Sequence, residues 1–207
     1  MFYEFAHGCA RLLTHAVARV HVDRADLFDQ PPPYILATNH LTSWDPPLIF
    51  ACASRRVRMT VLAADKWRKV PPILVLFNLM GAIWVRRGEV DRAALRRCVE
   101  VLQRGGVIGM SPEGTRSRTG GLIQGRPGVA YLARKAGVPI LPVALWGVEQ
   151  IGPNWRRLRR TDVYLRVGEF IHLPPGEARA TQLDADTEHI MRAIASMLPE
   201  RYRGVYA

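Results

Sequence analysis

The chain has 207 residues, of which 48% are hydrophobic and 23% charged, a composition that argues against disorder and favours a folded globular protein. Its net charge is +11, from 29 Lys and Arg against 18 Asp and Glu. Such a balance favours anionic partners: nucleic acid, an anionic membrane surface or phosphate-bearing substrates. The alternative is an arginine-rich surface that is simply solvated.

The cysteines and histidines show no metal-binding or disulfide pattern. Cys9, Cys52 and Cys98 are odd in number and scattered, without a CxxC pair, so neither a disulfide framework nor a zinc site is expected. The six histidines lack paired ligand spacing such as HExxH. We therefore expect no metal and no bound cofactor.

Membrane-spanning and targeting segments are not expected either. The longest apolar run, residues 70–80, is interrupted by two prolines and an asparagine and is too short to cross a bilayer. The first four residues lack the basic character of a signal peptide.

The N-terminal residues 2–20 place apolar side chains at helical spacing, which predicts an amphipathic helix. Pro31, Pro32 and Pro33 then interrupt the chain before a β-rich run. We therefore predict an N-terminal helical segment over residues 1–30, a candidate for membrane association, and a single domain over residues 31–207.

After the prolines, short apolar runs alternate with helical patterns. One helix has clear ends, because Asp91 is a good N-cap and Gly105 follows its last turn. The pattern predicts strands at 34–38, 57–64, 82–86, 106–110, 139–145 and 163–168, and helices at 46–54, 91–104, 126–136 and 184–198. This alternation is typical of an α/β fold with a largely parallel or mixed sheet flanked by helices.

The first segment with chemical potential, residues 38–47, follows a predicted strand and precedes a helix. Asp45 stands five positions after His40, so the turn can fold the carboxylate back onto one imidazole nitrogen. That contact would fix the tautomer and leave the other nitrogen free to accept a proton. The alternative is a helix-capping aspartate beside an incidental histidine.

A second segment, residues 111–118, directly follows another predicted strand. Gly114 permits a tight turn and a close backbone approach to a ligand. Arg116 and Arg118 supply charge-assisted donors for a phosphate, and Glu113 can orient an arginine or a hydroxyl. The alternative is a polar turn with ordinary surface ion pairs.

Two further segments are less specific. Residues 81–88 form a predicted strand that ends in Arg86 and Arg87, whose side chains alternate to opposite sides. Residues 137–143 form an apolar strand with Pro139 and Pro142, which indicate a strand entry or a sheet edge.

In this order the four segments resemble the four motifs of the glycerolipid acyltransferase family, whose best-known members are lysophosphatidic acid acyltransferases. The most specific match is the unbroken Pro-Glu-Gly-Thr-Arg-Ser motif at residues 112–117, and the His-x-x-x-x-Asp motif matches residues 40–45. The arginine-ending strand matches residues 81–87, and Val-Pro-Ile-x-Pro-Val matches residues 138–143. The resemblance covers residues 34–145, about half of the chain.

The chain departs from the family pattern at three positions. Thr42 replaces a frequent serine, and Ser111 stands where phenylalanine usually precedes the proline. Arg86 stands where Asp or Asn commonly precedes the motif's arginine, which bears on the preference for the acceptor's headgroup.

The resemblance implies an acyltransferase domain over residues 31–207, with His40 as general base and Asp45 as its orienting carboxylate. It implies transfer of a fatty acyl group from acyl-CoA or acyl carrier protein to a lysophospholipid, with 1-acyl-sn-glycerol-3-phosphate first among the acceptors. The acceptor's phosphate and glycerol would be bound by a further set of residues, which Arg126 would assist: Arg87, Glu113, Gly114, Thr115 and Arg116.

A lipid acceptor implies a cytoplasmic protein peripheral to the inner face of the cell membrane. Residues 2–20 and 66–77 are candidates for interfacial contact, with burial in the core as the alternative. Within the same chemistry, the acceptor could instead be a lyso-ornithine lipid or a glycolipid, or acyl groups could pass between phospholipids. A different class, a basic nucleic-acid-binding module, is suggested by residues 155–160 but leaves the ordered motifs unexplained.

Overall fold

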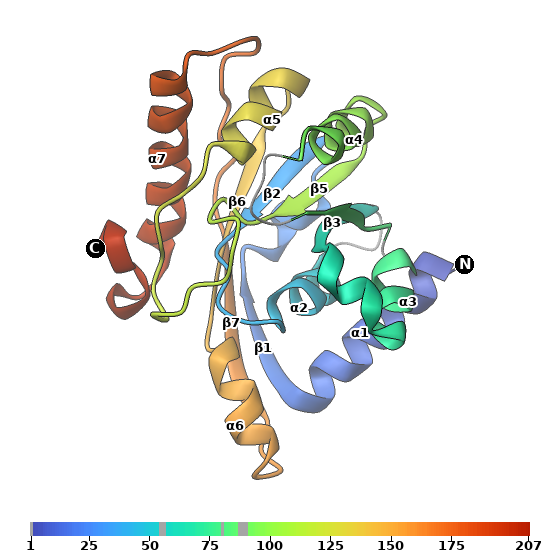
Figure 1. Ribbon diagram of the computed structural model, residues 1–207. Coiled ribbons are helices and arrows are strands. Elements are labelled where there is room, and N and C mark those ends of the chain that lie inside the picture. Colours follow the sequence, from blue (N-terminus) through green and yellow to red (C-terminus); the bar gives the residue numbers. More distant parts are fainter. Residues whose placement is uncertain (1, 54–56, 80, 87–90) are drawn as a thin grey trace.

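The structure, a computed structural model, describes residues 2–53, 57–79, 81–86 and 91–207. Its centre is a seven-stranded sheet with the strand order β1-β7-β6-β2-β5-β3-β4 (Figure 1). The five strands from β6 to β4 are parallel, whereas β7 runs antiparallel to β6 and β1 runs parallel to β7. The strands are β1 Ala18–Asp23, β2 Tyr34–Thr38, β3 Met59–Ala64, β4 Ile83–Val85, β5 Val107–Met110, β6 Ile140–Trp146 and β7 Thr161–Val167.

Helices cover both faces of the sheet (Figure 1). The helices are α1 Phe2–Val17, α2 Asp45–Cys52, α3 Pro71–Leu79, α4 Arg92–Gln103, α5 Gly128–Ala136, α6 Ile151–Trp155 and α7 Ala180–Met197. Strand β2 is buried on both sides because Tyr34 and Leu36 pack with α1 and α2, whereas Ile35 and Ala37 pack with α4, α5 and α7. An unbroken apolar strand is what a central position in a parallel sheet requires.

The predicted fold class is confirmed, and each of the six predicted strands and four predicted helices has a counterpart within a few residues. The N-terminal helix is present but ends at Val17, so its predicted extension to residue 20 is wrong. Residues 18–23 form β1, in which half-buried Val20 and Val22 alternate with exposed Arg19 and His21. This period of two fits a strand, and the register with β7 fixes it. The short helices α3 and α6 were not predicted.

The loop between β5 and α5 is held by the C-terminal residues. Leu122 N–H donates to the carbonyl of Tyr202, and Val205 N–H donates to the carbonyl of Leu122. The N–H of Gly125 donates to the Tyr206 hydroxyl. These three hydrogen bonds hold the loop that carries residues 111–118 against the C-terminal residues.

No helix within the described ranges is long and apolar enough to cross a membrane. Strand β1 belongs to the same sheet as the rest, and α1 packs on α2 through buried Ala6 and Ala10. On its outer side α1 leaves Phe5, Leu12 and Leu13 exposed.

Candidate active site

A cavity of about 1170 Å³ opens at the carboxyl ends of the parallel strands, where open α/β sheets place their ligand sites. His40 and Asp45 lie in its wall, together with apolar side chains from α2, β3 and α4 such as Ile49, Met59 and Leu95. Among the described residues five cations also line it, Arg86, Arg92, Arg96, Arg126 and Lys135, against the acidic Asp91 and Glu100 besides Asp45. The cavity therefore combines a large apolar surface with a basic rim.

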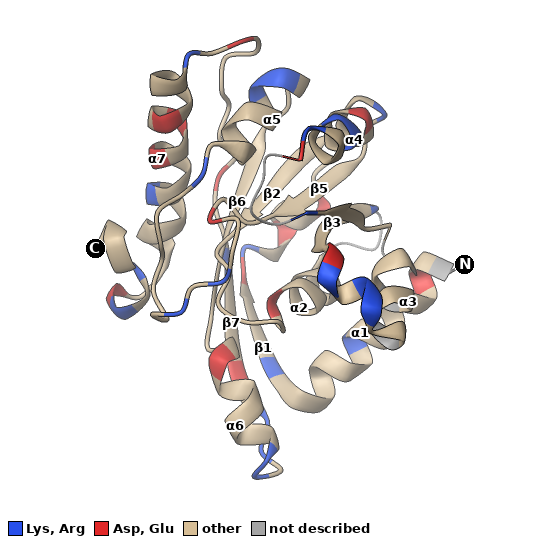
Figure 2. Ribbon diagram, in the orientation of Figure 1, with Lys and Arg blue, Asp and Glu red and all other residues tan. Residues whose placement is uncertain are grey.

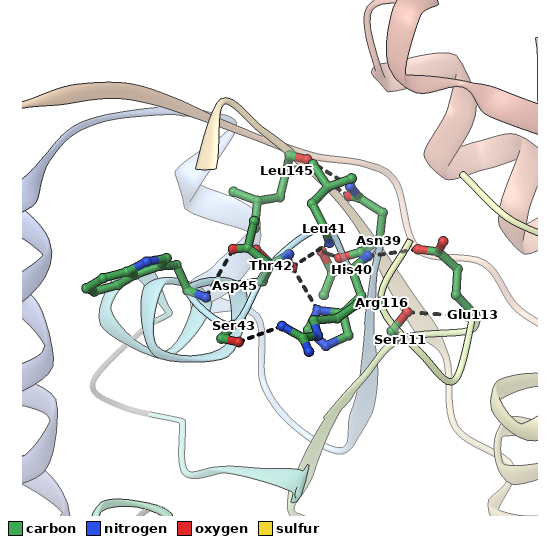
Figure 3. Close-up of polar contacts among 12 residues, drawn as sticks. Asn39, His40, Leu41, Thr42, Ser43, Asp45, Ser111, Glu113, Arg116 and Leu145 are labelled. Atoms are coloured by element: carbon green, nitrogen blue, oxygen red, sulfur yellow. Dashed lines mark hydrogen bonds and ion pairs between the residues drawn. The ribbon is translucent and has the colours of Figure 1, made fainter. Parts of the chain in front are cut away.

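The end of β2 is fixed by the buried Asn39 side chain. Its amide nitrogen donates to the Leu145 carbonyl at 2.8 Å, and its amide oxygen accepts from the Leu145 N–H at 2.8 Å (Figure 3). This pairing copies a backbone ladder, so β2 and β6 stay joined up to the residue before His40. The position of His40 is thereby tied to the sheet.

His40 and Asp45 form a close side-chain pair, with 2.7 Å between Nδ1 and Oδ2 (Figure 3). Asp45 is 2% exposed, yet its carboxylate accepts three further hydrogen bonds, from the N–H groups of Leu41 and Thr42 and from the Thr42 hydroxyl. A carboxylate with four donors is an acceptor only, so Nδ1 carries the proton and Nε2 is the nitrogen that can accept one.

Glu113 supports His40 through the backbone. Its side chain is 1% exposed, and its two oxygens accept from the N–H groups of His40 at 2.8 Å and Ile123 at 3.1 Å. The carbonyl of His40 accepts from the Ser117 N–H at 2.8 Å, so both backbone polar groups of His40 are bound to the same loop. Burial raises the pKa of Glu113 to about 7, against the opposing effect of the two N–H donors.

Gly114 and Thr115 line the cavity beside this support. Gly114 has a φ of +67°, and a Cβ at this position would lie 3.1 Å from Cδ of Arg126. Glycine therefore permits both the turn and the close approach of the arginine. Arg116 donates to the Ser43 hydroxyl at 2.8 Å, which joins the loop to the turn after β2.

The structure brings six of the seven predicted site residues to the ends of β2 and β5; Arg87 lies outside the described residues. Glu113 and Arg116 are not part of the cavity wall, in contrast to Gly114 and Thr115. The sequence alone assigns no role to Asn39, whose partner is 106 residues away. The hydrogen bond from the Thr42 hydroxyl to Asp45 has a local sequence pattern. A threonine three residues before an acidic side chain at a helix start resembles a capping box.

Comparison with known proteins places this site in a family. The sequence model of the Acyltransferase family matches residues 19–146, more than half of the chain. The chain belongs to the Acyltransferase family.

Individual relatives point in the same direction. A 1-acyl-sn-glycerol-3-phosphate acyltransferase of Borreliella burgdorferi is 32% identical over 117 residues, which cover 54% of this chain and 45% of the relative. The chloroplastic 1-acyl-sn-glycerol-3-phosphate acyltransferase BAT2 of Brassica napus is 35% identical over 89 residues, 41% of this chain and 25% of the relative. The chain thus aligns with less than half the length of either relative.

The fold is also that of a solved structure. The 1-acyl-sn-glycerophosphate (LPA) acyltransferase PlsC of Thermotoga maritima superimposes with a TM-score of 0.72, covering 91% of this chain and 76% of its own, at 24% identity. The likeness covers more of this chain than the family match does, and it concerns the fold.

Proposed function

We propose that the chain transfers a fatty acyl group from an acyl thioester to the free hydroxyl of a lysophospholipid, with 1-acyl-sn-glycerol-3-phosphate as the preferred acceptor and phosphatidic acid as the product. The observation that carries the proposal is the His40–Asp45 pair in the wall of an apolar cavity with a basic rim. The sequence relatives support the choice of acceptor.

In the proposed reaction, Nε2 of His40 takes the proton of the acceptor hydroxyl while that oxygen attacks the thioester carbonyl. A C–O bond forms, the C–S bond breaks, and the imidazolium returns its proton to the departing thiolate. Asp45 balances the charge of the imidazolium during these steps. Because thiolate is a good leaving group, no covalent acyl-enzyme is required.

The cavity can hold both parts of a lysolipid. Apolar side chains of α2, β3 and α4 suit an acyl chain, whereas Arg126 and Arg86 suit its phosphate. We propose that Arg87 and Arg116 add to the phosphate site and that Thr115 binds the glycerol. Glu113 is a positioning residue in this proposal, because both of its oxygens are engaged by backbone N–H groups.

We also propose that the protein works at the inner face of the cell membrane, where its acceptor lies. Exposed Phe5, Leu12 and Leu13 on α1 support this. In the segment 66–77, Lys66, Lys69 and Val75 are also exposed, which favours the interface over the core. The donor is an acyl thioester of CoA or of acyl carrier protein.

The test is to incubate the purified chain with a panel of lysolipids and both donors and to identify products by mass spectrometry. We expect phosphatidic acid from 1-acyl-sn-glycerol-3-phosphate at the highest rate. Acylation of a lyso-ornithine lipid or a glycolipid instead would replace the acceptor but keep the chemistry. The absence of any acylated lipid with either donor would contradict the proposal.

A further inference from the structure

The turn that follows α6 has an unusual charge. We define the α6 turn as residues 155–160, Trp-Arg-Arg-Leu-Arg-Arg, which places four arginines among six residues. No acidic residue occurs from 151 to 161. The turn lies at the tip of α6, which projects beyond the lower end of the sheet (Figure 1), and the arginines are coloured there in Figure 2.

The α6 turn also displays apolar side chains to solvent. Leu158 is 90% exposed and Trp155 is 51% exposed. Leu158 adopts a φ of +53°, a left-handed conformation that residues with a Cβ rarely adopt without support. The left-handed backbone closes the end of α6, but the Leu158 side chain itself packs little against the molecule.

Hydrogen bonds hold the turn in this shape. The N–H of Leu158 donates to the Trp155 carbonyl at 2.9 Å, and the Asn154 carbonyl accepts from the N–H groups of Arg157 and Arg159. The Asn154 side chain donates to the Thr161 hydroxyl at 3.0 Å, at the start of β7. The exposed leucine and tryptophan are therefore held by an ordered backbone.

The α6 turn is joined to the N-terminal helix. The Arg160 guanidinium donates to the carbonyl of Ala18 at 2.8 Å, at the residue where α1 gives way to β1. One to two helical turns earlier, α1 exposes Leu12 and Leu13. The basic turn is thus bonded to the junction between α1 and β1.

We propose that the α6 turn is a membrane-contact site that places Leu158 and Trp155 among the headgroups and upper acyl chains of an anionic bilayer. Arg156, Arg157 and Arg159 contact lipid phosphates in this arrangement. Tryptophan and arginine are suited to the interface, and an aliphatic side chain at the apex gains free energy by leaving water. A nucleic acid would use the arginines and could stack on Trp155, but it offers nothing comparable to Leu158.

The proposal relies on the proposed function only for the lipid nature of the acceptor, and it can be tested without turnover. The test uses phosphatidylcholine vesicles with and without phosphatidylglycerol, and two variants of the full chain. In Trp155→Ser with Leu158→Ser the apolar tip is removed, and in Arg156→Gln with Arg157→Gln and Arg159→Gln the charge is removed. Arg160 is kept, because it bonds to the carbonyl of Ala18.

Matched controls remove the same charge or apolar surface elsewhere. Arg97, Arg104 and Arg179 are exposed and distant in sequence from the turn, and their joint replacement by Gln also lowers the net charge by three. Val205→Ser removes another exposed aliphatic side chain. All variants must keep the melting temperature of the parent chain to be compared.

We expect the arginine variant to bind anionic vesicles on the order of 100-fold more weakly, since each arginine near an anionic surface contributes about fivefold. The Trp155 and Leu158 variant should bind about tenfold more weakly, and the controls should change by about twofold or less. Transfer to a short-chain soluble lysolipid should be unchanged in every variant.

Unchanged vesicle binding in both variants would overturn the proposal. It would also be overturned if the arginine variant lost binding to duplex DNA while it kept binding to anionic vesicles, because the turn would then be a nucleic-acid contact. If the parent chain shows no acyl transfer at all, the proposed function fails, and vesicle binding still decides the role of the turn.

Discussion

Among the described residues, two histidine–aspartate pairs lie in different surroundings. At the end of β2, His40 and Asp45 are 16% and 2% exposed and 2.7 Å apart. On the sheet surface, His21 of β1 and Asp162 of β7 are 52% and 45% exposed and 3.0 Å apart. Both have a histidine nitrogen within hydrogen-bond distance of a carboxylate, so the pair alone does not define a catalytic base.

The difference lies in what surrounds each carboxylate. Asp45 accepts two backbone N–H bonds and a hydroxyl bond besides that of His40, and the pair lies in the wall of a cavity. Asp162 faces solvent and Arg19, and its hydrogen bond to His21 is the main reason that its pKa is lowered. The His21 ring stacks on Tyr164 at a centroid distance of 4.8 Å. The buried pair has the surroundings that the proposed proton transfer needs, whereas the exposed pair joins two strands.

The largest expected effect is on kcat, and it distinguishes His40 from His21. His40→Ala should lower kcat by about 10²–10⁴-fold, because the general base is lost. His21→Ala is the matched control and should leave kcat unchanged, since His21 lies outside the cavity wall. Thiol release from an acyl thioester in the presence of lysolipid measures both. Near-parental turnover in a folded His40→Ala variant would show that His40 is not the general base.

The same substitution at Asp45 and at Asp162 distinguishes the roles of the two carboxylates. Asp45→Asn keeps the shape but removes the charge that stabilises the imidazolium, so we expect a large fall in kcat with a smaller change in KM for the acceptor. Asp162→Asn should alter neither constant. An effect of Asp45→Asn on KM alone would mean that Asp45 serves binding and not catalysis.

The raised pKa of Glu113, which binds the backbone of His40, predicts how the stability of the protein changes with pH. Burial raises the pKa of Glu113 to about 7 from an ordinary value of 4.5, so the unfolded chain loses this proton first as pH rises. The stability contributed by protonated Glu113 is therefore complete below about pH 4.5 and is lost as pH rises through about 7. Compared with Glu113→Gln, the parent chain should lose melting temperature across this window. Parallel curves for the two proteins would contradict the raised pKa.

The same substitution should also slow the reaction. Glutamine replaces one of the two accepting oxygens of Glu113 by an NH2 group, which donates, so the backbone N–H of His40 or of Ile123 loses its acceptor. We expect kcat to fall on the order of tenfold, since a lost hydrogen bond of this kind is worth about 1–2 kcal/mol. An unchanged kcat and a raised acceptor KM would show that Glu113 binds substrate after all.

The smallest expected effect concerns metals. The described residues contain no group of three or more His, Cys, Asp or Glu side chains that could hold an ion, and neither histidine pair includes another such ligand. Treatment with a chelator should leave the transfer rate within error of the untreated protein. Activity that is lost on chelation and restored by one divalent ion would refute a metal-free mechanism.

Local patterns were enough to predict most of the fold. The apolar run 34–38 is a buried strand, and the N-cap at Asp91 does accept from the Ala94 N–H. Strand β1 was missed because residues 18–20 also continue the helical spacing of α1, and only pairing with β7 decides between the two. Helix propensity and strand alternation overlap at such junctions, where tertiary contacts determine the outcome.

The sequence predicts those hydrogen bonds of the site that join residues close together in the chain. Asp45 is five positions from His40, so their contact follows from one turn. The bonds of Asn39 to Leu145 and of the His40 N–H to Glu113 span 106 and 73 positions, and no spacing rule reveals them. The motif therefore predicts Glu113 beside the substrate, whereas the fold buries it against the backbone of His40.

The most direct test of the account is to follow thiol release and acylated lipid together, with and without 1-acyl-sn-glycerol-3-phosphate. If the acceptor hydroxyl, deprotonated by His40, attacks the thioester itself, thiol and product should appear in equal amounts and only when the acceptor is present. The intact protein should keep its mass throughout. A burst of thiol equal to the amount of enzyme without acceptor, together with an acylated protein, would contradict direct transfer.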